Sequence, residues 1–359
     1  MTPLTVQNAQ WSLLSYQLEN AVGGSGVSKI DVILCDVTLS NGAAGFGFSY
    51  AIGGKGAGAM VAARDISDAV IQGQPFVTPE ASWRKVTAAC NRTGKGPNFV
   101  GLAALDVALW DAYAKTLDVP LGQAMGGEMR AVKVYGSGGY RPNHTGDQTE
   151  AQIQMHREQG FDAIKLRLSG TTSDQVLLDR ARSVGGDRLQ IMVDLNEKTN
   201  LIDARYTLDM ASDYGVYLVE EPLRARDFQG YRILAERYPG LIATGEHLQG
   251  LDEAAPFLQD SMCAAMQPDL AMMGGLTESL RVARWAEYVG IEIMPHFLPG
   301  LFVHLAAAAP NLTWLEDFPL LEPLFETMPT ANDGMLDAFE VAGHGLLLTE
   351  QARKSAKTL

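Results

Sequence analysis

From residue 132 onward, short apolar runs alternate with segments of helical periodicity, and this alternation constrains the fold more than any other feature. The apolar runs are VKVYG (132–136), AIKLRL (163–168), LQIMVD (189–194), VYLVEE (216–221), LIATGE (241–246), AAMQPD (264–269), IEIMPH (291–296) and LTWLE (312–316). The segments between them place apolar residues at helical spacing, and many end at glycine. Strands that alternate with helices form parallel sheets joined by right-handed crossovers. The pattern therefore predicts an α/β fold with a TIM-type barrel whose last unit is short.

The first third of the sequence follows a different pattern. Residues 11–20 and 29–42 are β-rich and predict two antiparallel strands joined by a turn. Residues 53–72 and 99–118 have helical patterns. We therefore expect an α+β domain in front of the barrel, and a tail after residue 320 that packs back on it.

Composition and charge narrow the classes of function. The 359 residues carry a formal net charge of −14, which disfavours a nucleic-acid partner, because nucleic-acid-binding domains are usually basic. The cysteines, Cys35, Cys90 and Cys263, have no CxxC spacing, so we expect reduced thiols and a cytoplasmic location. The sequence has no run of about 20 apolar residues, so no membrane-spanning helix is expected.

Seven of the predicted strands end in ionisable side chains. These are Lys165 with Arg167, Asp194, Glu220 with Glu221, Glu246, Asp269, His296 and Glu316. Successive positions are 20 to 27 residues apart, about one strand–helix unit. Because the carboxyl ends of barrel strands share one mouth, these side chains are predicted to converge there. Lys165 and Arg167 are two residues apart on one strand and should point to the same side.

Three of these acids predict a metal site. An acid after a strand is usually a helix cap or a solvated loop residue, but Asp194, Glu220 and Glu246 recur in successive units. Unpaired, they would repel one another at close range. A divalent cation resolves the repulsion, and carboxylate oxygens favour Mg²⁺, with Mn²⁺ as a substitute. The acids have no cysteine and no pair of histidines near them, which disfavours zinc.

Asp269 and His296 end the next two predicted strands. A single histidine is more often structural than catalytic. Side chains at neighbouring strand ends can form a hydrogen bond, however, and an aspartate would orient the imidazole and raise its basicity. The pair is therefore predicted to act as a general acid/base.

An ordered set of short motifs resembles one enzyme family. ALDVALWDAYAKTLDVPLGQAMGG (104–127) precedes the barrel, and KLR, VDLN, VEEP, GEHLQG, QPD, MPH and WLE follow in order. Together they resemble the mandelate racemase subgroup of the enolase superfamily, the mandelate racemase/muconate lactonizing enzyme family. The resemblance implies a modified TIM barrel, (β/α)7β, over residues 128–319. It also implies an α+β capping domain over residues 1–127, completed by the tail of residues 320–359.

The resemblance also implies roles. Asp194, Glu220 and Glu246 match the Mg²⁺ ligands, and Asp269 and His296 match the acid/base dyad. Glu316 matches a protonated donor to the substrate carboxylate, while Lys165 and Arg167 match a Lys-x-Lys pair beside an enediolate intermediate. Arg167 departs from the family, where the second lysine is a base. A guanidinium rarely accepts a proton near neutral pH.

These roles favour a Mg²⁺-dependent lyase that removes the proton α to a carboxylate. The favoured reaction is dehydration of a sugar acid, an aldonate or aldarate, to a 2-keto-3-deoxy acid. The alternative is a racemase or epimerase of an α-hydroxy acid that uses Arg167 or Lys165 opposite His296. A cycloisomerase fits less well, because that branch has a lysine in place of His296. An inactive scaffold that keeps the fold and the metal is the non-enzyme alternative.

The substrate contacts are predicted in the capping domain and beside the metal site. Cap loops near residues 16–28 and 46–58 should close over the barrel and set specificity. The candidate contacts are Tyr50, Lys55 and, next to Asp194, Asn196. A second substrate carboxylate would suit Lys55, although a solvated role for this lysine fits equally well. The resemblance also implies a homo-oligomer.

Overall fold

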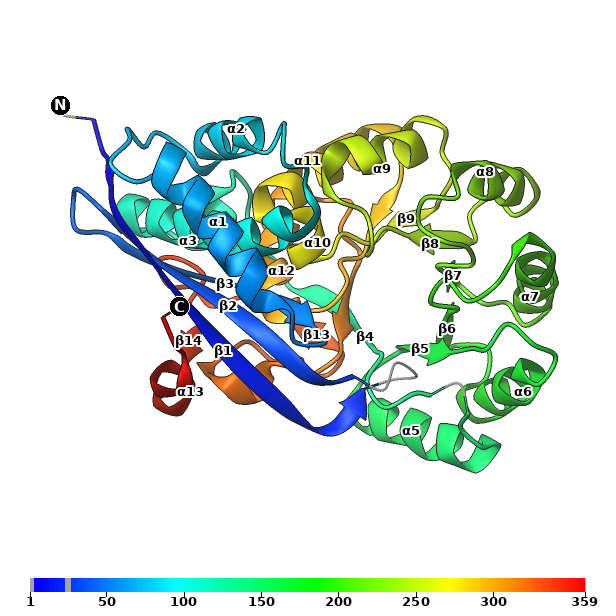
Figure 1. Ribbon diagram of the computed structural model, residues 1–359. Coiled ribbons are helices and arrows are strands. Elements are labelled where there is room, and N and C mark those ends of the chain that lie inside the picture. The colour runs from blue at the N-terminus through cyan, green and yellow to red at the C-terminus, as the bar shows by residue number, and fades with distance from the viewer. Residues whose placement is uncertain (1–2, 23–26, 142, 359) are drawn as a thin grey trace.

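A three-stranded antiparallel sheet opens the chain (Figure 1). The computed structural model describes residues 3–22, 27–141 and 143–358, and the sheet consists of β1 (Val6–Val22), β2 (Val27–Leu39) and β3 (Ala44–Ile52) in that order. Strand β3 was not predicted. It corrects the prediction of a cap loop near residues 46–58, and β1 likewise occupies residues 16–22 of the other predicted loop. Residues 23–26 of that loop lie outside the described ranges.

Four helices follow this sheet: α1 (Gly56–Val70), α2 (Pro79–Ala89), α3 (Gly96–Leu117) and α4 (Leu121–Ala124). Helix α3 is apolar on most sides and largely buried, because it packs against β3 on one side and against barrel helices on another. A Cβ atom on Gly47 of β3 would lie 2.1 Å from the carbonyl oxygen of Ala104. Glycine therefore permits this close approach of strand and helix.

Eight parallel strands form the barrel in the described part of the chain. They are β4 (Val132–Gly136), β5 (Ala163–Arg167), β6 (Gln190–Asp194), β7 (Leu218–Glu220), β8 (Ile242–Thr244), β9 (Ala265–Met266), β10 (Glu292–Ile293) and β11 (Trp314–Asp317). They neighbour one another in sequence order from β4 to β10, and β11 pairs with β4. A bridge between Ile293 and Leu312 joins the remaining edges. All eight predicted strand runs are confirmed.

Helices cover the outside of this barrel (Figure 1). They are α5 (Gly146–Glu158), α6 (Asp174–Gly185), α7 (Leu201–Asp213), α8 (Phe228–Arg237), α9 (Gly250–Gln259), α10 (Leu270–Met273), α11 (Leu276–Val289) and α12 (Pro299–Ala308). The inside holds a cluster of side chains from the strands, including Tyr135, Met192 and Trp314. Strand β11 follows α12 and has no helix of the same kind after it, so the predicted (β/α)7β class is confirmed.

The tail returns to the first sheet. It consists of a 3₁₀ turn η1 (Glu322–Leu324), β12 (Phe325–Thr327), β13 (Met335–Leu336), β14 (Leu347–Leu348) and α13 (Glu350–Ser355). Leu13 of β1 and Lys357 exchange two backbone hydrogen bonds of 2.8 and 2.9 Å. The Phe325 ring lies 5.0 Å from the ring of Phe48 on β3. The division of the chain at residues 127 and 319 stays a prediction.

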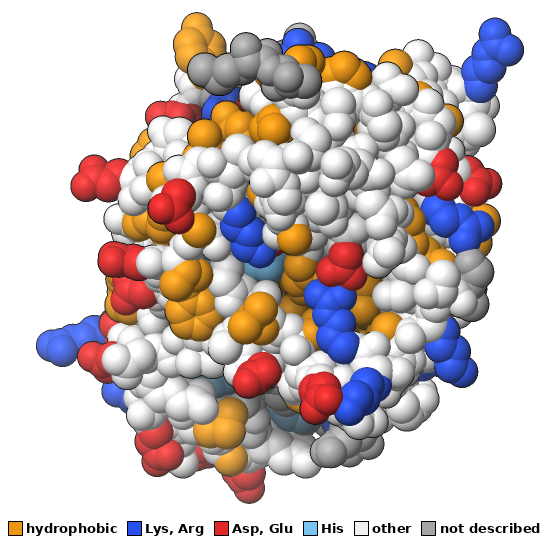
Figure 2. All heavy atoms as spheres, turned by 90° about the vertical axis from the view of Figure 1, so that its left-hand side faces the viewer, with side chains coloured by type: hydrophobic (Ala, Val, Ile, Leu, Met, Phe, Trp, Pro, Cys, Tyr) orange, Lys and Arg blue, Asp and Glu red, His pale blue; other side chains and the backbone are white. Residues whose placement is uncertain are grey.

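The distribution of surface charge and the length of the helices can be compared with what nucleic-acid and membrane partners require. On the face shown in Figure 2, acidic and basic side chains lie interspersed. Among the helices of the described ranges, none is both long and apolar enough to cross a membrane.

Candidate active site

The barrel presents the predicted site residues at the carboxyl ends of its strands. Arg167, Asp194 and Glu220 end β5, β6 and β7. The register places Arg167 beside Asp194, and Asp194 beside Glu220. Asp269 and His296 form a parallel bridge just after β9 and β10. The structure therefore brings these five residues to one mouth, as the spacing in the sequence predicts.

Glu246 reaches the same mouth through a glycine turn after β8. Gly245 has a φ of +134°. A Cβ atom at this position would lie 2.5 Å from Met266 Sδ and 2.9 Å from the Gln267 backbone nitrogen. Both the backbone conformation and the lack of space therefore require glycine before Glu246.

Lys165 is fully buried and holds two carboxylates. Its Nζ atom donates hydrogen bonds to Glu220 Oε1 and Oε2 at 2.9 and 2.7 Å, and it pairs with Glu316 Oε1 at 2.8 Å. Burial alone would lower the pKa of Lys165, but the Glu220 and Glu316 carboxylates outweigh burial and hold the pKa well above its usual value. The Lys165 side chain is therefore a fixed cation.

Arg167 is the second cation of β5 and points to the same side of the strand. Its guanidinium forms an ion pair with Asp194 and lines a cavity at the barrel mouth. Both cations of β5 thus face carboxylates of other strands, Arg167 that of Asp194 on the neighbouring β6 and Lys165 those on β7 and β11. This is the arrangement that the alternation of side chains predicts.

Glu316 lies deep in the site, on β11. Its Oε2 atom accepts a hydrogen bond of 2.9 Å from the Phe297 backbone. Burial would raise the pKa of Glu316, but Lys165, His296 and Arg167 outweigh burial and lower it. The structure therefore favours the ionised carboxylate over the protonated donor that the family resemblance implies, because Lys165 lies in direct contact.

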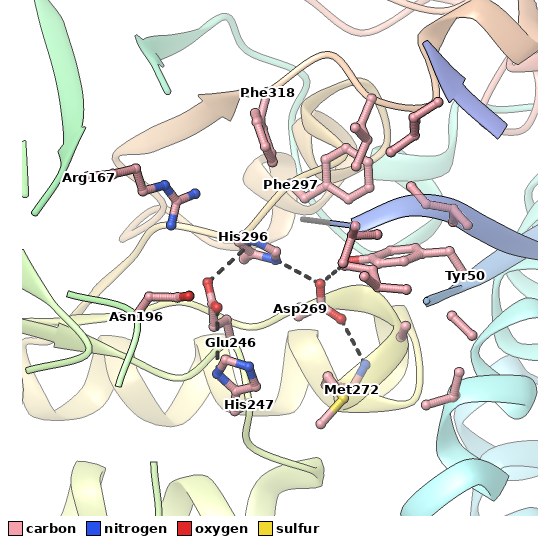
Figure 3. A pocket seen from close by; sticks show the side chains of 18 of the residues that line it. Tyr50, Arg167, Asn196, Glu246, His247, Asp269, Met272, His296, Phe297 and Phe318 are labelled. Atoms are coloured by element: carbon pink, nitrogen blue, oxygen red, sulfur yellow. Dashed lines mark hydrogen bonds and ion pairs between the residues drawn. The ribbon is translucent and has the colours of Figure 1, made fainter. Parts of the chain in front are cut away.

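His296 and Asp269 form the predicted dyad (Figure 3). His296 Nδ1 lies 2.9 Å from Asp269 Oδ2, and the Met272 backbone N–H donates to Asp269 Oδ1 at 2.8 Å. The Tyr50 hydroxyl of β3 also donates to Asp269 Oδ2. Donors from the cap and from the barrel therefore fix the orientation of this aspartate. The bond from Tyr50 was not predicted.

The other ring nitrogen of the dyad faces the acids of the mouth. His296 Nε2 lies 3.3 Å from Glu246 Oε2 and 4.0 Å from Glu316 Oε2. Burial would lower the pKa of His296, but the charge of Glu246, the hydrogen bond that His296 donates to Asp269 and the charge of Glu316 outweigh burial and raise it to about 10. Burial alone would raise the pKa of Glu246. Nearby positive charges, of which His296 is the largest contributor, outweigh burial and lower this pKa to about 2.

The arrangement of the acids fits a hard divalent cation. Asp194 Oδ2 and Glu246 Oε2 are buried and accept no hydrogen bond, and their partners are the cations Arg167 and His296. Buried oxygens of this kind are the ligands that Mg²⁺ prefers. Glu220 is held more firmly, because Lys165 and the Gln267 side-chain amide, at 2.6 Å from Oε2, donate to it.

A group of residues behind the acids was not predicted. Glu197, Glu221 and His247 place ligand-type atoms within 4.8 Å of one another, whereas the three predicted ligands form no such group in the described structure. His247 Nδ1 lies 2.7 Å from Glu221 Oε1, and burial is the largest cause of a strongly raised pKa at Glu221. The sequence signal for two of them was adjacency, because Glu221 and His247 directly follow the predicted ligands Glu220 and Glu246, whereas Glu197 lies three residues after Asp194.

The polar mouth opens into a cavity of about 460 Å³ between the barrel and the first sheet. Asn196 lines this cavity, as does Tyr50, although the Tyr50 hydroxyl is bonded to Asp269. Lys55 does not line it. This lysine is exposed just before α1, so the structure does not bring it to the predicted site.

Known families match both parts of the chain. Residues 6–126 match the family described as "Mandelate racemase / muconate lactonizing enzyme, N-terminal domain", and residues 148–352 match "Enolase C-terminal domain-like". The second match alone spans more than half of the 359 residues.

Individual relatives agree with these families. The L-talarate/galactarate dehydratase of Salmonella typhimurium is 29% identical over 330 residues, which cover 91% of this chain and 83% of that protein. The solved L-talarate dehydratase of Polaromonas sp. JS666, complexed with Mg and L-glucarate, is 29% identical with a TM-score of 0.91 and covers 99% of this chain and 98% of that one. The Salmonella enzyme liganded with Mg and L-lyxarohydroxamate has a TM-score of 0.92 at 28% identity, covering 99% of this chain and 94% of that one. The resemblance drawn from the sequence is therefore confirmed, and this chain belongs to the mandelate racemase/muconate lactonizing enzyme family of the enolase superfamily.

Proposed function

We propose that this protein is a Mg²⁺-dependent hydro-lyase that converts a sugar acid to a 2-keto-3-deoxy acid. The observation that carries the proposal is the His296–Asp269 dyad, which faces a mouth of buried carboxylates and fixed cations. The similarity to L-talarate/galactarate dehydratase supports the same reaction class.

Asp194, Glu220 and Glu246 would hold the metal ion. Mn²⁺ presents similar chemistry to oxygen ligands and is the expected substitute. When bound, the ion supplies a Lewis acid that stabilises negative charge on the substrate carboxylate. Asn196 lines the cavity two residues beyond Asp194 and is a candidate contact for a substrate hydroxyl.

His296 is the proposed base. Its Nδ1–H is directed at Asp269, so in the neutral imidazole the lone pair lies on Nε2, which points into the mouth. Nε2 takes the C2 proton of the acid. The C3 hydroxyl then leaves as water with the proton that His296 now carries, and the enol product becomes the 2-keto-3-deoxy acid.

Arg167 and Lys165 stabilise the negative charge that develops during proton removal. Arg167 lines the cavity, and Lys165 lies buried behind it between Glu220 and Glu316. Neither side chain suits the second base that a racemase requires. A guanidinium stays protonated near neutral pH, and the two carboxylates raise the pKa of Lys165. The absence of a suitable second base in Arg167 and Lys165 favours dehydration over racemisation.

The experiment follows purified protein with Mg²⁺ and a set of mono- and diacid sugars by proton NMR. We expect a 2-keto-3-deoxy product from at least one acid. His296→Asn should abolish this product, whereas His144→Asn, a matched change outside the cavity lining, should retain it. Inversion at C2 with no keto product would refute the proposal and favour the racemase.

The proposed reaction takes place on a small carboxylate. A cytoplasmic location, a homo-oligomer and the absence of a nucleic-acid partner stay predictions. Light scattering on the purified chain measures the oligomeric state directly.

A further inference from the structure

The cavity has two chemically different ends. Its polar side chains come from the barrel mouth, where Arg167, Asn196, Glu246 and His296 gather. Figure 3 shows Asn196 and Glu246 on one side and the ring of Phe297 on another, with Phe318 next to Arg167. A substrate whose carboxylate and C2 hydroxyl lie at the mouth must direct its remaining carbons toward the other end.

That other end is apolar. Leu18, Val27, Ile30 and Ile52 of the first sheet line it, together with Leu320 after β11, whereas the Phe318 ring centroid lies 5.8 Å from the Arg167 guanidinium. The polar group that β3 supplies there, the Tyr50 hydroxyl, already donates to Asp269. A distal hydroxyl or carboxylate would therefore gain no hydrogen-bond partner from these side chains to replace any water that it loses.

The first sheet also supplies no cation to the cavity among the residues that the structure describes. Lys55 is exposed and does not line the cavity. Lys29 is paired with Asp31 at 3.4 Å and is likewise not a lining residue. Among the residues that the structure describes, the side chains that the first sheet contributes to the lining therefore offer a second carboxylate no opposite charge.

Lys198 is the competing cation. It lines the cavity from the segment after β6, on the barrel side near Asn196, and it is exposed. Partial burial of its ammonium group, and then the charge of Arg167, lower the pKa of Lys198. Lys198 lies beside the mouth and therefore near the reacting end of a substrate. It is the alternative partner for a second carboxylate.

We infer that the enzyme selects monocarboxylic acids with an uncharged, apolar distal end, such as 6-deoxyaldonates, over dicarboxylic sugar acids. The inference rests on the proposed function for the reaction but concerns a different part of the cavity. It separates this chain from relatives whose names specify the diacids talarate and galactarate.

The first test measures binding and does not require turnover. The matched probes are 2-hydroxyhexanoate and 2-hydroxyadipate, which share a six-carbon chain and differ by a terminal carboxylate. Calorimetry with Mg²⁺ present should give a Kd at least about tenfold lower for 2-hydroxyhexanoate. Equal or tighter binding of 2-hydroxyadipate, or no binding of either acid, would overturn the inference.

Variants locate the effect. Ile52→Lys adds a cation to the apolar wall at a residue that is 51% exposed, and it should improve 2-hydroxyadipate binding by about tenfold. Ile202→Lys makes the same change on α7, outside the cavity lining, and should leave both Kd values unchanged. Lys198→Met should also leave the preference unchanged. A large loss of 2-hydroxyadipate affinity in Lys198→Met would show that Lys198 receives the second carboxylate, and would contradict the inference.

Turnover distinguishes this inference from the proposed function. A 6-deoxyaldonate should be dehydrated with a kcat/KM at least about 100-fold above that of the matching aldarate. Faster dehydration of the aldarate would refute the inference and leave the proposed function intact. Absence of dehydration with every acid would refute the proposed function, while the binding preference would still decide the inference.

Discussion

The hydrogen bond from Tyr50 to Asp269 connects the first sheet to the proposed catalytic dyad, and Tyr50→Phe tests its role. The change removes one hydroxyl and keeps the ring, which packs edge-on against Phe297 at 5.1 Å and 88°. Burial, and then the charge of Asp269, raise the pKa of Tyr50 well above its usual value, so the hydroxyl stays protonated and donates. Phenylalanine therefore leaves Asp269 with the donors from His296 and Met272.

The expected magnitude follows from the charge of the acceptor. A hydrogen bond to a charged group contributes about 1.5–3 kcal/mol. If the whole loss appears in the orientation of His296, kcat falls by about 10- to 150-fold. The remaining donors to Asp269 make this range an upper limit. Because the bond positions the dyad, the loss should appear in kcat, with KM nearly unchanged.

The assay measures kcat and KM for Tyr50→Phe on the acid that the wild-type protein dehydrates. Tyr288→Phe makes the same change on a side chain that is 89% exposed and serves as the control. A rise in KM at constant kcat would refute the positioning role. That result would support the sequence-based prediction that Tyr50 contacts the substrate.

Three further predictions concern charge. Lys165→Met leaves Glu220 and Glu316 buried without their cation, so it should lower the free energy of unfolding, measured in urea, by about 3–5 kcal/mol. The control Lys354→Met breaks an ion pair on the surface and should change this free energy little. A loss under about 1 kcal/mol for Lys165→Met would contradict the buried ion pairs. Mg²⁺ should lower the pKa of His296 from its metal-free value of about 10, because the ion offsets the anionic charge of Glu246; an NMR titration with and without Mg²⁺ measures this, and identical curves would place the ion elsewhere. Burial raises the pKa of Asp106 to about 7, so the folded state binds a proton at this carboxyl more tightly than the unfolded state does. The stability of the wild type relative to Asp106→Asn should therefore fall by about 1.4 kcal/mol per pH unit as the pH rises from about 4 to 7. Parallel pH profiles of the two proteins would contradict that assignment.

Much of the site follows from local periodicity. A strand places alternate side chains on one side, so Lys165 and Arg167 were expected together. A barrel brings its strand ends to one mouth, so residues as far apart as Asp194 and His296 were expected there. These predictions need only the strand pattern, and the structure confirms the geometry on which they depend. The catalytic and metal-binding roles of these residues stay predictions.

Contacts between distant segments were not predictable in this way. Tyr50 and Asp269 are separated by 219 residues and meet only because the first sheet covers the barrel mouth. The Glu316 carboxylate could not be assigned as ionised before Lys165 was seen in contact with it. Lys55 was expected near the substrate because it lies in the predicted cap loop near residues 46–58, but the turn at residues 53–54 directs the chain away into α1.

The exchange of the C2 proton in D₂O tests the central claim most directly. Wild-type protein with Mg²⁺ is incubated with the best-bound 2-hydroxy acid that lacks a C3 hydroxyl, so that no water can leave, and the C2 signal is followed by proton NMR. The account predicts that deuterium replaces the C2 proton with retention of configuration and that His296→Asn abolishes this exchange. Exchange that persists in His296→Asn, or that inverts C2, would show that another base acts in this site and would contradict the account.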